Sequence, residues 1–131
     1  MRFLIPLLLA SLLASGCSSG EPSTYKASGT AKCLGGKGYR VTTDPTRIGV
    51  IAAAAPNGGL RAFEPGNALT IAFAADAKDA LEIQKAFKRF APKRLRRHIT
   101  DVMRTQKNAV LLWTVTPPID ELNKVFGCLK G

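Results

Sequence analysis

The chain has 131 residues, which is enough for one domain and too few for two of ordinary size. It carries 19 Lys and Arg against 9 Asp and Glu, a formal charge of +10, and 46% of its residues are hydrophobic. This hydrophobic fraction excludes a disordered chain, and the length excludes a multidomain enzyme and a polytopic membrane protein. We therefore expect a small, basic, globular protein.

Residues 1–16 have the pattern of a secretory signal, with a charged start and an apolar run over residues 3–14 that is too short to span a membrane. Residues 13–17, Leu-Ala-Ser-Gly-Cys, resemble the lipobox of bacterial lipoproteins, although that family prefers Leu or Val where Ala14 stands. The resemblance implies that Cys17 is acylated with chains such as palmitate, becomes the mature N-terminus and anchors the protein outside the cytoplasmic membrane. An ordinary signal-peptidase site is the alternative, and it would give a secreted, soluble protein.

The segment after Cys17 is small, polar and interrupted by Gly and Pro, as in a flexible tether. The folded unit should begin between Tyr25 and Thr30, so we assign residues 17–29 to the lipidated cysteine and tether and residues 30–131 to a single domain. Cys33 and Cys128 remain near the two ends of this domain. An even pair in an oxidising compartment predicts a disulfide, because no Cys-x-x-Cys motif or nearby His supports a redox or metal site.

Helix and strand signals alternate along the domain. Asp76 has the pattern of an N-cap before an apolar stripe at Ala80, Ile83, Phe87 and Phe90, and Pro92 should end that helix. The run 109–115 should be a central strand that is covered on both faces. The predicted elements are a helix at 25–34, a strand at 39–42, a helix at 46–55 capped by Asp44-Pro45, a hairpin of strands 60–63 and 68–73, a helix at 77–90, the strand at 109–115, and a helix at 119–129 with an apolar stripe from Ile119 to Leu129.

Without the terminal helices, this order is strand-helix-strand-strand-helix-strand. It predicts an α+β fold, a small two-layer sandwich with a ferredoxin-like antiparallel sheet, helices on one face and the terminal helices joined by the disulfide. Residues 93–108 remain open between a helix and a strand that pairs with 109–115.

Several segments resemble small secreted proteins and lipoproteins of high-GC Gram-positive bacteria. They are Cys33-Leu34, the strand at 69–73, the run at 108–113, Pro117 and Cys128-Leu129. The resemblance implies one cystine-closed domain at the cell envelope and carries no catalytic motif. The basic stretch between Pro92 and Asn108 is longer than the corresponding connection in that family.

The sequence offers little for catalysis. No Ser follows Ser28 and His98 is the only histidine, so neither a Ser-His-acid triad nor a His-based metal site can be assembled in the domain. We therefore expect no enzyme, no cofactor and no metal. A small carboxylate-dependent envelope hydrolase or transferase is the alternative, and its candidate acids are Asp76, Asp79, Glu82 and the pair Asp120-Glu121.

Positive charge gathers between residues 85 and 107, where nine basic residues accompany Asp101 alone. They are Lys85, Lys88, Arg89, Lys93, Arg94, Arg96, Arg97, Arg104 and Lys107. Such a stretch attracts anions, although it can equally be a solvated face of a basic protein. We expect a non-catalytic, lipid-anchored envelope module that binds an anionic lipid, a wall polymer or an envelope protein through these residues. The address outside the cytoplasm argues against nucleic acid.

Overall fold

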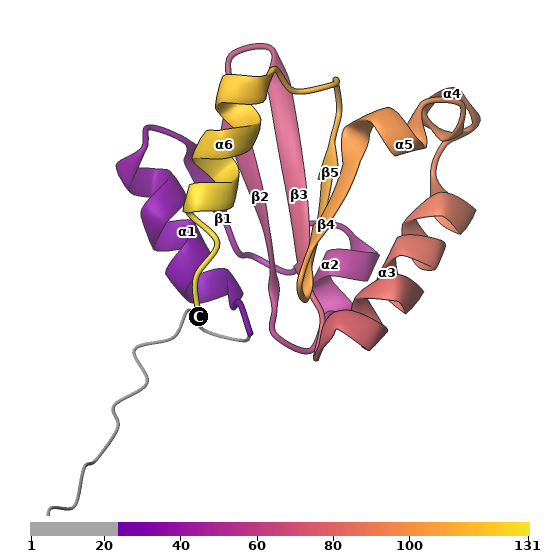
Figure 1. The fold of residues 1–131 in the computed structure, drawn as a ribbon, viewed down its shortest axis with the longest axis horizontal. Coiled ribbons are helices and arrows are strands. Elements are labelled where there is room, and N and C mark those ends of the chain that lie inside the picture. Colours follow the sequence, from indigo (N-terminus) through magenta and orange to yellow (C-terminus); the bar gives the residue numbers. More distant parts are fainter. Residues whose placement is uncertain (1–23) are drawn as a thin grey trace, which may run out of the picture.

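The computed structural model describes residues 24–131 (Figure 1). The signal peptide at 1–16, the lipidation of Cys17 and the tether up to residue 23 lie outside these residues and remain predictions. The hydrophobic core begins at Tyr25. This position is the first of the range, Tyr25 to Thr30, in which the sequence predicts the start of the folded unit. Residues 25–131 contain the five-stranded sheet, both hydrophobic clusters and the disulfide.

The chain forms five strands and six helices over the described residues. In chain order these are α1 (Ala27–Gly36), β1 (Arg40–Thr42), α2 (Val50–Ala54), β2 (Gly59–Glu64), β3 (Asn67–Phe73), α3 (Ala77–Phe90), α4 (Lys93–Arg96), α5 (Ile99–Val102), β4 (Met103–Gln106), β5 (Ala109–Trp113) and α6 (Ile119–Gly127). The predicted hairpin is confirmed as β2 and β3, with Gly66 at a positive φ in the turn. The N-cap of α3 is also confirmed, because the Asp76 carboxylate accepts a hydrogen bond from the Asp79 amide at 2.7 Å.

The strands form one antiparallel sheet in the order β1-β2-β3-β5-β4. The α+β class and the antiparallel sheet are confirmed, whereas the ferredoxin-like arrangement is wrong. In that arrangement another strand separates the first two strands, but here β1 pairs directly with β2. The connection through the five-residue helix α2 brings the chain back antiparallel beside β1 instead of crossing over to a parallel position, and residues 103–106 add a fifth strand that pairs with β5.

The expectation of two layers is also wrong, because helices cover both faces of the sheet. Side chains alternate along β5, so Leu111 and Trp113 join a cluster with α1 and α6, and Val110 joins a second cluster with α2 and α3. Figure 1 shows these two pairs of helices on opposite sides of the sheet. Strand β5 is therefore interior and covered on both faces as predicted, while β3 occupies the middle of the sheet.

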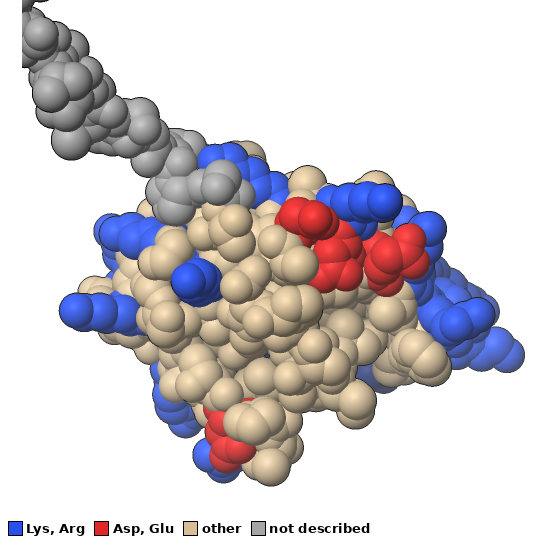
Figure 2. Space-filling view, turned by 90° about the horizontal axis from the view of Figure 1, so that it is seen from below, with Lys and Arg blue, Asp and Glu red and all other residues tan. Residues whose placement is uncertain are grey.

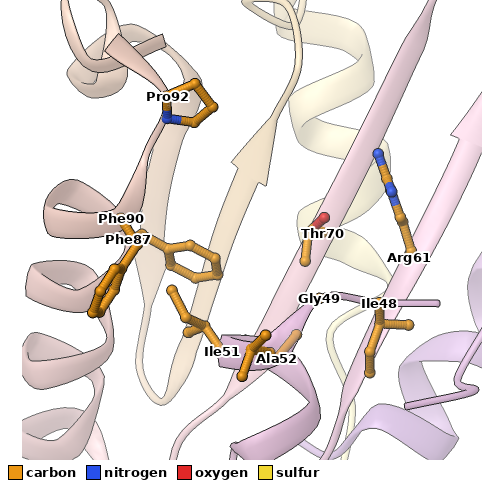
Figure 3. Close-up of a pocket in the computed structure, with 10 residues that line it drawn as sticks. Ile48, Gly49, Ile51, Ala52, Arg61, Thr70, Phe87, Phe90 and Pro92 are labelled. Carbon is orange, nitrogen blue, oxygen red and sulfur yellow. The ribbon is translucent and has the colours of Figure 1, made fainter. Parts of the chain in front are cut away.

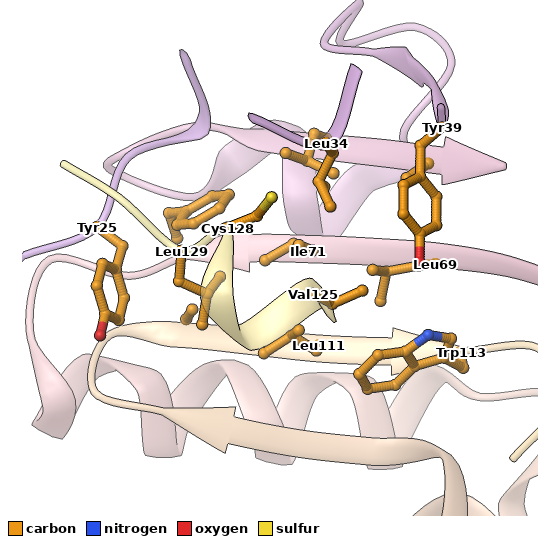
Figure 4. Packing of buried hydrophobic residues seen from close by; sticks show 14 of the residues in the cluster. Tyr25, Leu34, Tyr39, Leu69, Ile71, Leu111, Trp113, Val125, Cys128 and Leu129 are labelled. Atoms are coloured by element: carbon orange, nitrogen blue, oxygen red, sulfur yellow. The ribbon is translucent and has the colours of Figure 1, made fainter. Parts of the chain in front are cut away.

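The predicted disulfide is present between Cys33 of α1 and Cys128, which follows α6. Their Cα atoms lie 5.3 Å apart although the residues are 95 positions apart in the sequence. Cys128 is fully buried among the core residues that Figure 4 shows, beside Leu129 and Ile71. The ends of the unit also meet through the backbone, because the Lys26 amide donates to the Lys130 carbonyl at 2.7 Å.

Three local predictions need correction. Helix α2 begins at Val50 rather than residue 46, because Gly49 has a φ of 88° that interrupts the helix, and Asp44 closes a turn on Thr46 instead. Phe90 is 71% exposed, because the chain leaves α3 at this residue and Ala91 takes the next buried position. Ile119, the first residue of α6, is likewise 73% exposed.

Candidate functional site

Six of the nine predicted basic residues lie in one part of the fold, at the end of α3 and around α4. Lys85, Lys88 and Arg89 occupy the last turns of α3, where positive side chains also interact favourably with the helix C-terminus. Pro92 prevents α3 from continuing, and the chain turns directly into α4. This reversal places Lys93, Arg94 and Arg97 beyond the end of α3, and all six side chains are exposed.

One shallow hollow of this basic segment has a volume of about 340 Å³ and is lined by Lys93, Arg94, Arg97 and His98. Its lining contains no carboxylate, although the Asp101 carboxylate lies 3.9 Å from the His98 Nδ1 atom. Within residues 24–131, the side chains of Lys93, Arg94 and Arg97 form no ion pair or hydrogen bond. We call this feature the basic hollow. The hollow therefore gathers three cationic side chains, and clustered cations attract phosphate and carboxylate groups.

The other three predicted basic residues do not join this cluster. The Arg96 guanidinium donates to the Ala91 carbonyl at 3.1 Å, and the Arg104 guanidinium donates to three carbonyl groups at the end of α5. Both therefore have structural roles. Lys107 lies in the β4–β5 turn with a φ of 51°, and its ammonium lies 5.3 Å from the centroid of the Tyr25 ring. Seen from below, Lys and Arg lie at several places around the margin of the molecule (Figure 2).

A second concave feature lies between α2 and α3 on the sheet (Figure 3). This groove has a volume of about 710 Å³, within the usual range for small-molecule sites. Its lining is apolar apart from Arg61 and Thr70, and consists otherwise of Ile48, Gly49, Val50, Ile51, Ala52, Phe87, Phe90 and Pro92. Gly59 lets α2 lie close to β2, because a Cβ atom at this position would come within 2.4 Å of the Ala52 carbonyl oxygen.

Arg61 also lines a second hollow of about 700 Å³ on the same face of the sheet, together with Arg40 and Arg47. The Arg40 and Arg61 guanidinium groups lie 5.3 and 5.2 Å from the centroid of the Phe63 ring. Among residues 24–131, none of these three arginines forms an ion pair with a carboxylate. Asp44 is close enough for the charge of Arg47 to contribute to its lowered pKa, although hydrogen bonds from Thr46 contribute more.

The sequence did not reveal this second group of arginines, because charge was summed over continuous segments of the chain and these residues come from different segments. Arg61 and Phe63 are two residues apart on β2 and therefore share a face, and Arg40 is the register partner of Phe63 on β1. The alternation of Arg61 and Phe63 within a predicted strand was the available signal.

The acids that come together are not those singled out from the sequence, apart from Glu121. Glu121 of α6 is 7% exposed and accepts a hydrogen bond from the Tyr39 hydroxyl at 3.1 Å. Burial and a hydrogen bond with Glu121 raise the pKa of Glu64 to about 7. Burial and the same carboxylate also raise the pKa of Tyr39. Neither Glu64 nor Glu121 lines the groove or the basic hollow, so the pair contributes to packing at the end of β2.

No cluster of three or more His, Cys, Asp and Glu residues that could hold a metal occurs within residues 24–131. In the same part of the chain, no helix combines the length and the apolar character needed to cross a bilayer. Comparisons of the chain with protein-family models, with curated proteins and with solved structures found no match.

Proposed function

We propose that the protein is a non-catalytic module of the bacterial cell envelope, held at the membrane by lipid on Cys17, that binds an anionic surface through the basic hollow. The observation that carries this proposal is that Lys93, Arg94, Arg97 and His98 line one hollow whose lining contains no carboxylate. Three cations in the same hollow repel one another, and an anion between them relieves that repulsion.

Anionic lipid headgroups fit this arrangement best among the anionic partners expected from the sequence. Each Lys or Arg near an anionic membrane surface contributes about 1 kcal/mol to binding. A lipidated Cys17 would hold the protein at the membrane, and the basic hollow would add attraction to anionic headgroups there. Phe90 lies at the end of α3, beside the basic residues, and offers an exposed apolar side chain that can enter the headgroup region.

A carboxylate-dependent hydrolase or transferase is the weaker proposal. It requires two acids at an accessible concave site, and the acids that do meet, Glu64 and Glu121, line neither the groove nor the basic hollow. Glu121 is also buried beneath the Tyr39 hydroxyl. The pair supports packing better than it supports acid-base chemistry on a substrate.

Vesicle sedimentation tests the proposal. A chain of residues 18–131 lacks Cys17 and retains the sheet, both hydrophobic clusters and the disulfide, so its binding reports the basic hollow without the lipid anchor. We expect it to sediment with phosphatidylglycerol-containing vesicles and to be released as salt increases, because salt screens exposed charges. Equal binding to neutral phosphatidylcholine vesicles, or binding that salt does not weaken, would contradict the proposal.

A further inference from the structure

The groove between α2 and α3 is polar at one place only. Eight of its ten lining residues are apolar or glycine, and the two polar ones, Arg61 and Thr70, are register partners on β2 and β3. Register partners in an antiparallel pair project from the same face, so both side chains lie on the floor of the groove (Figure 3). The site therefore presents an apolar wall and a single polar end.

The polar end is suited to an anion. The Arg61 Nε atom is enclosed and has no hydrogen-bond partner within the described residues. A buried donor without a partner is costly, and a ligand that accepts its hydrogen bond would remove that cost. Arg40 and Arg47 share the adjoining hollow with Arg61, so the positive charge at this end exceeds one unit.

The rim of the groove is unusually apolar for an exposed surface. Val50 on α2 is 85% exposed and Phe90 on α3 is 71% exposed, and both line the groove. Large apolar side chains at the mouth of an apolar groove are typical of ligand-binding sites. The wall continues inward through the buried side chains of Ile48 and Phe87.

We propose that this groove binds a fatty acid, with the hydrocarbon chain between α2 and α3 and the carboxylate at Arg61. The guanidinium group can donate two parallel hydrogen bonds to a carboxylate, and the Thr70 hydroxyl lies beside it on the next strand. This site uses none of the cations of the basic hollow, so it does not depend on the proposed function. The protein would then bind a free fatty acid in this groove and an anionic membrane surface at the basic hollow.

A single-chain carboxylate fits the groove better than a peptide does. A peptide carries backbone N–H and C=O groups along its whole length, and these lose water in a groove whose apolar wall offers them no partners. A fatty acid is polar at one end only, as the lining is. The volume of about 710 Å³ accommodates such a ligand.

Calorimetric titration of residues 18–131 with dodecanoate, 1-dodecanol and butyrate tests the proposal. Dodecanoate should bind saturably at one site, below the concentration at which it forms micelles. Dodecanol lacks the charge that Arg61 binds, and butyrate lacks the chain, so each should bind at least tenfold more weakly. Equal affinity for dodecanoate and dodecanol would overturn the role of the arginine. Absence of saturable dodecanoate binding would overturn the proposal as a whole.

Two pairs of variants locate the site. Arg61→Met should weaken dodecanoate about tenfold and leave dodecanol unchanged, whereas Lys32→Met, which removes one positive charge from the exposed side of α1, should change neither. Phe90→Ala removes an exposed rim residue and should weaken both ligands, whereas Ile119→Ala on the exposed start of α6 should not. Because Phe90 is exposed, its variant keeps the test valid even if Arg61→Met fails to fold. Dodecanoate affinity that is unchanged in Phe90→Ala would place the ligand elsewhere and overturn the proposal.

Discussion

Glu64 of β2 lies close enough to Glu121 of α6 for that carboxylate to raise the pKa of Glu64. Burial is the largest cause that raises the pKa of Glu64 to about 7, and the hydrogen bond and charge of Glu121 add to it. Lys124 acts in the opposite direction. The pair therefore makes packing between α6 and the sheet dependent on pH near neutrality.

We expect the free energy of unfolding to fall between pH 5 and pH 8. The unfolded chain releases the Glu64 proton near 4.5, whereas the folded chain holds it up to about 7. The folded state therefore binds more protons within this window, and raising the pH favours unfolding. Glu64 is partly exposed, so the contribution is only about 1 kcal/mol after solvent screening.

Urea unfolding at the two pH values measures this slope. Glu64→Gln should remove most of it, and Glu82→Gln, which alters an exposed acid on α3, should leave it unchanged. Equal slopes for the wild type and Glu64→Gln would show that Glu64 does not hold its proton in the folded state.

Removal of the disulfide should destabilise the domain strongly. Closing a loop between Cys33 and Cys128, 95 positions apart, removes on the order of 4 kcal/mol of conformational entropy from the unfolded chain. We expect the Cys33→Ala/Cys128→Ala variant, and the reduced wild type, to melt at a markedly lower temperature. Thiol titration of denatured residues 18–131 should find no free thiol before reduction. Two titratable thiols in unreduced protein would contradict the bridge.

Asn108 connects the start of the folded unit to the sheet. Its side chain is 1% exposed, accepts a hydrogen bond from the Tyr25 amide at 2.7 Å, and donates to the Tyr25 and Ala74 carbonyls at 2.9 and 2.8 Å. Asn108→Ala leaves the buried backbone groups of Tyr25 without these partners and should cost about 2 to 3 kcal/mol in urea unfolding. Asn123→Ala on the exposed side of α6 is the matched control. A loss below 0.5 kcal/mol, the usual limit for surface substitutions, would contradict the structural role of Asn108.

The elements that sequence predicted well are those with local causes. Pro65 and Gly66 produce the β2–β3 turn, the Asp76 side chain caps α3, and Pro92 prevents that helix from continuing. The pairing of Cys33 with Cys128 was predictable because these are the two cysteines that remain once Cys17 is assigned to the lipid anchor. In each case, the physical cause lies within a few residues of the element or in the number of available partners.

The elements that sequence did not predict depend on partners far along the chain. Strand order was wrong because an apolar alternation shows which face is buried and does not show which strand lies beside it. The sequence left segment 93–108 open between a helix and a strand, and the segment forms both, because the short helices α4 and α5 precede strand β4. The groove was not foreseen because Arg61 and Phe90 come from β2 and α3 and meet only in the fold.

The most direct test of the proposed function compares two charge reversals of equal size in a salt series with phosphatidylglycerol vesicles. Lys93→Glu/Arg94→Glu/Arg97→Glu reverses the basic hollow, whereas Lys32→Glu/Lys37→Glu/Lys130→Glu reverses three exposed lysines outside it. Each cation contributes about 1 kcal/mol near an anionic surface, so we expect the first variant to lose at least tenfold in vesicle affinity and the second to stay within a few-fold of the wild type. Equal losses in both variants would show that binding follows net charge, and would contradict the assignment of the anion site to α4.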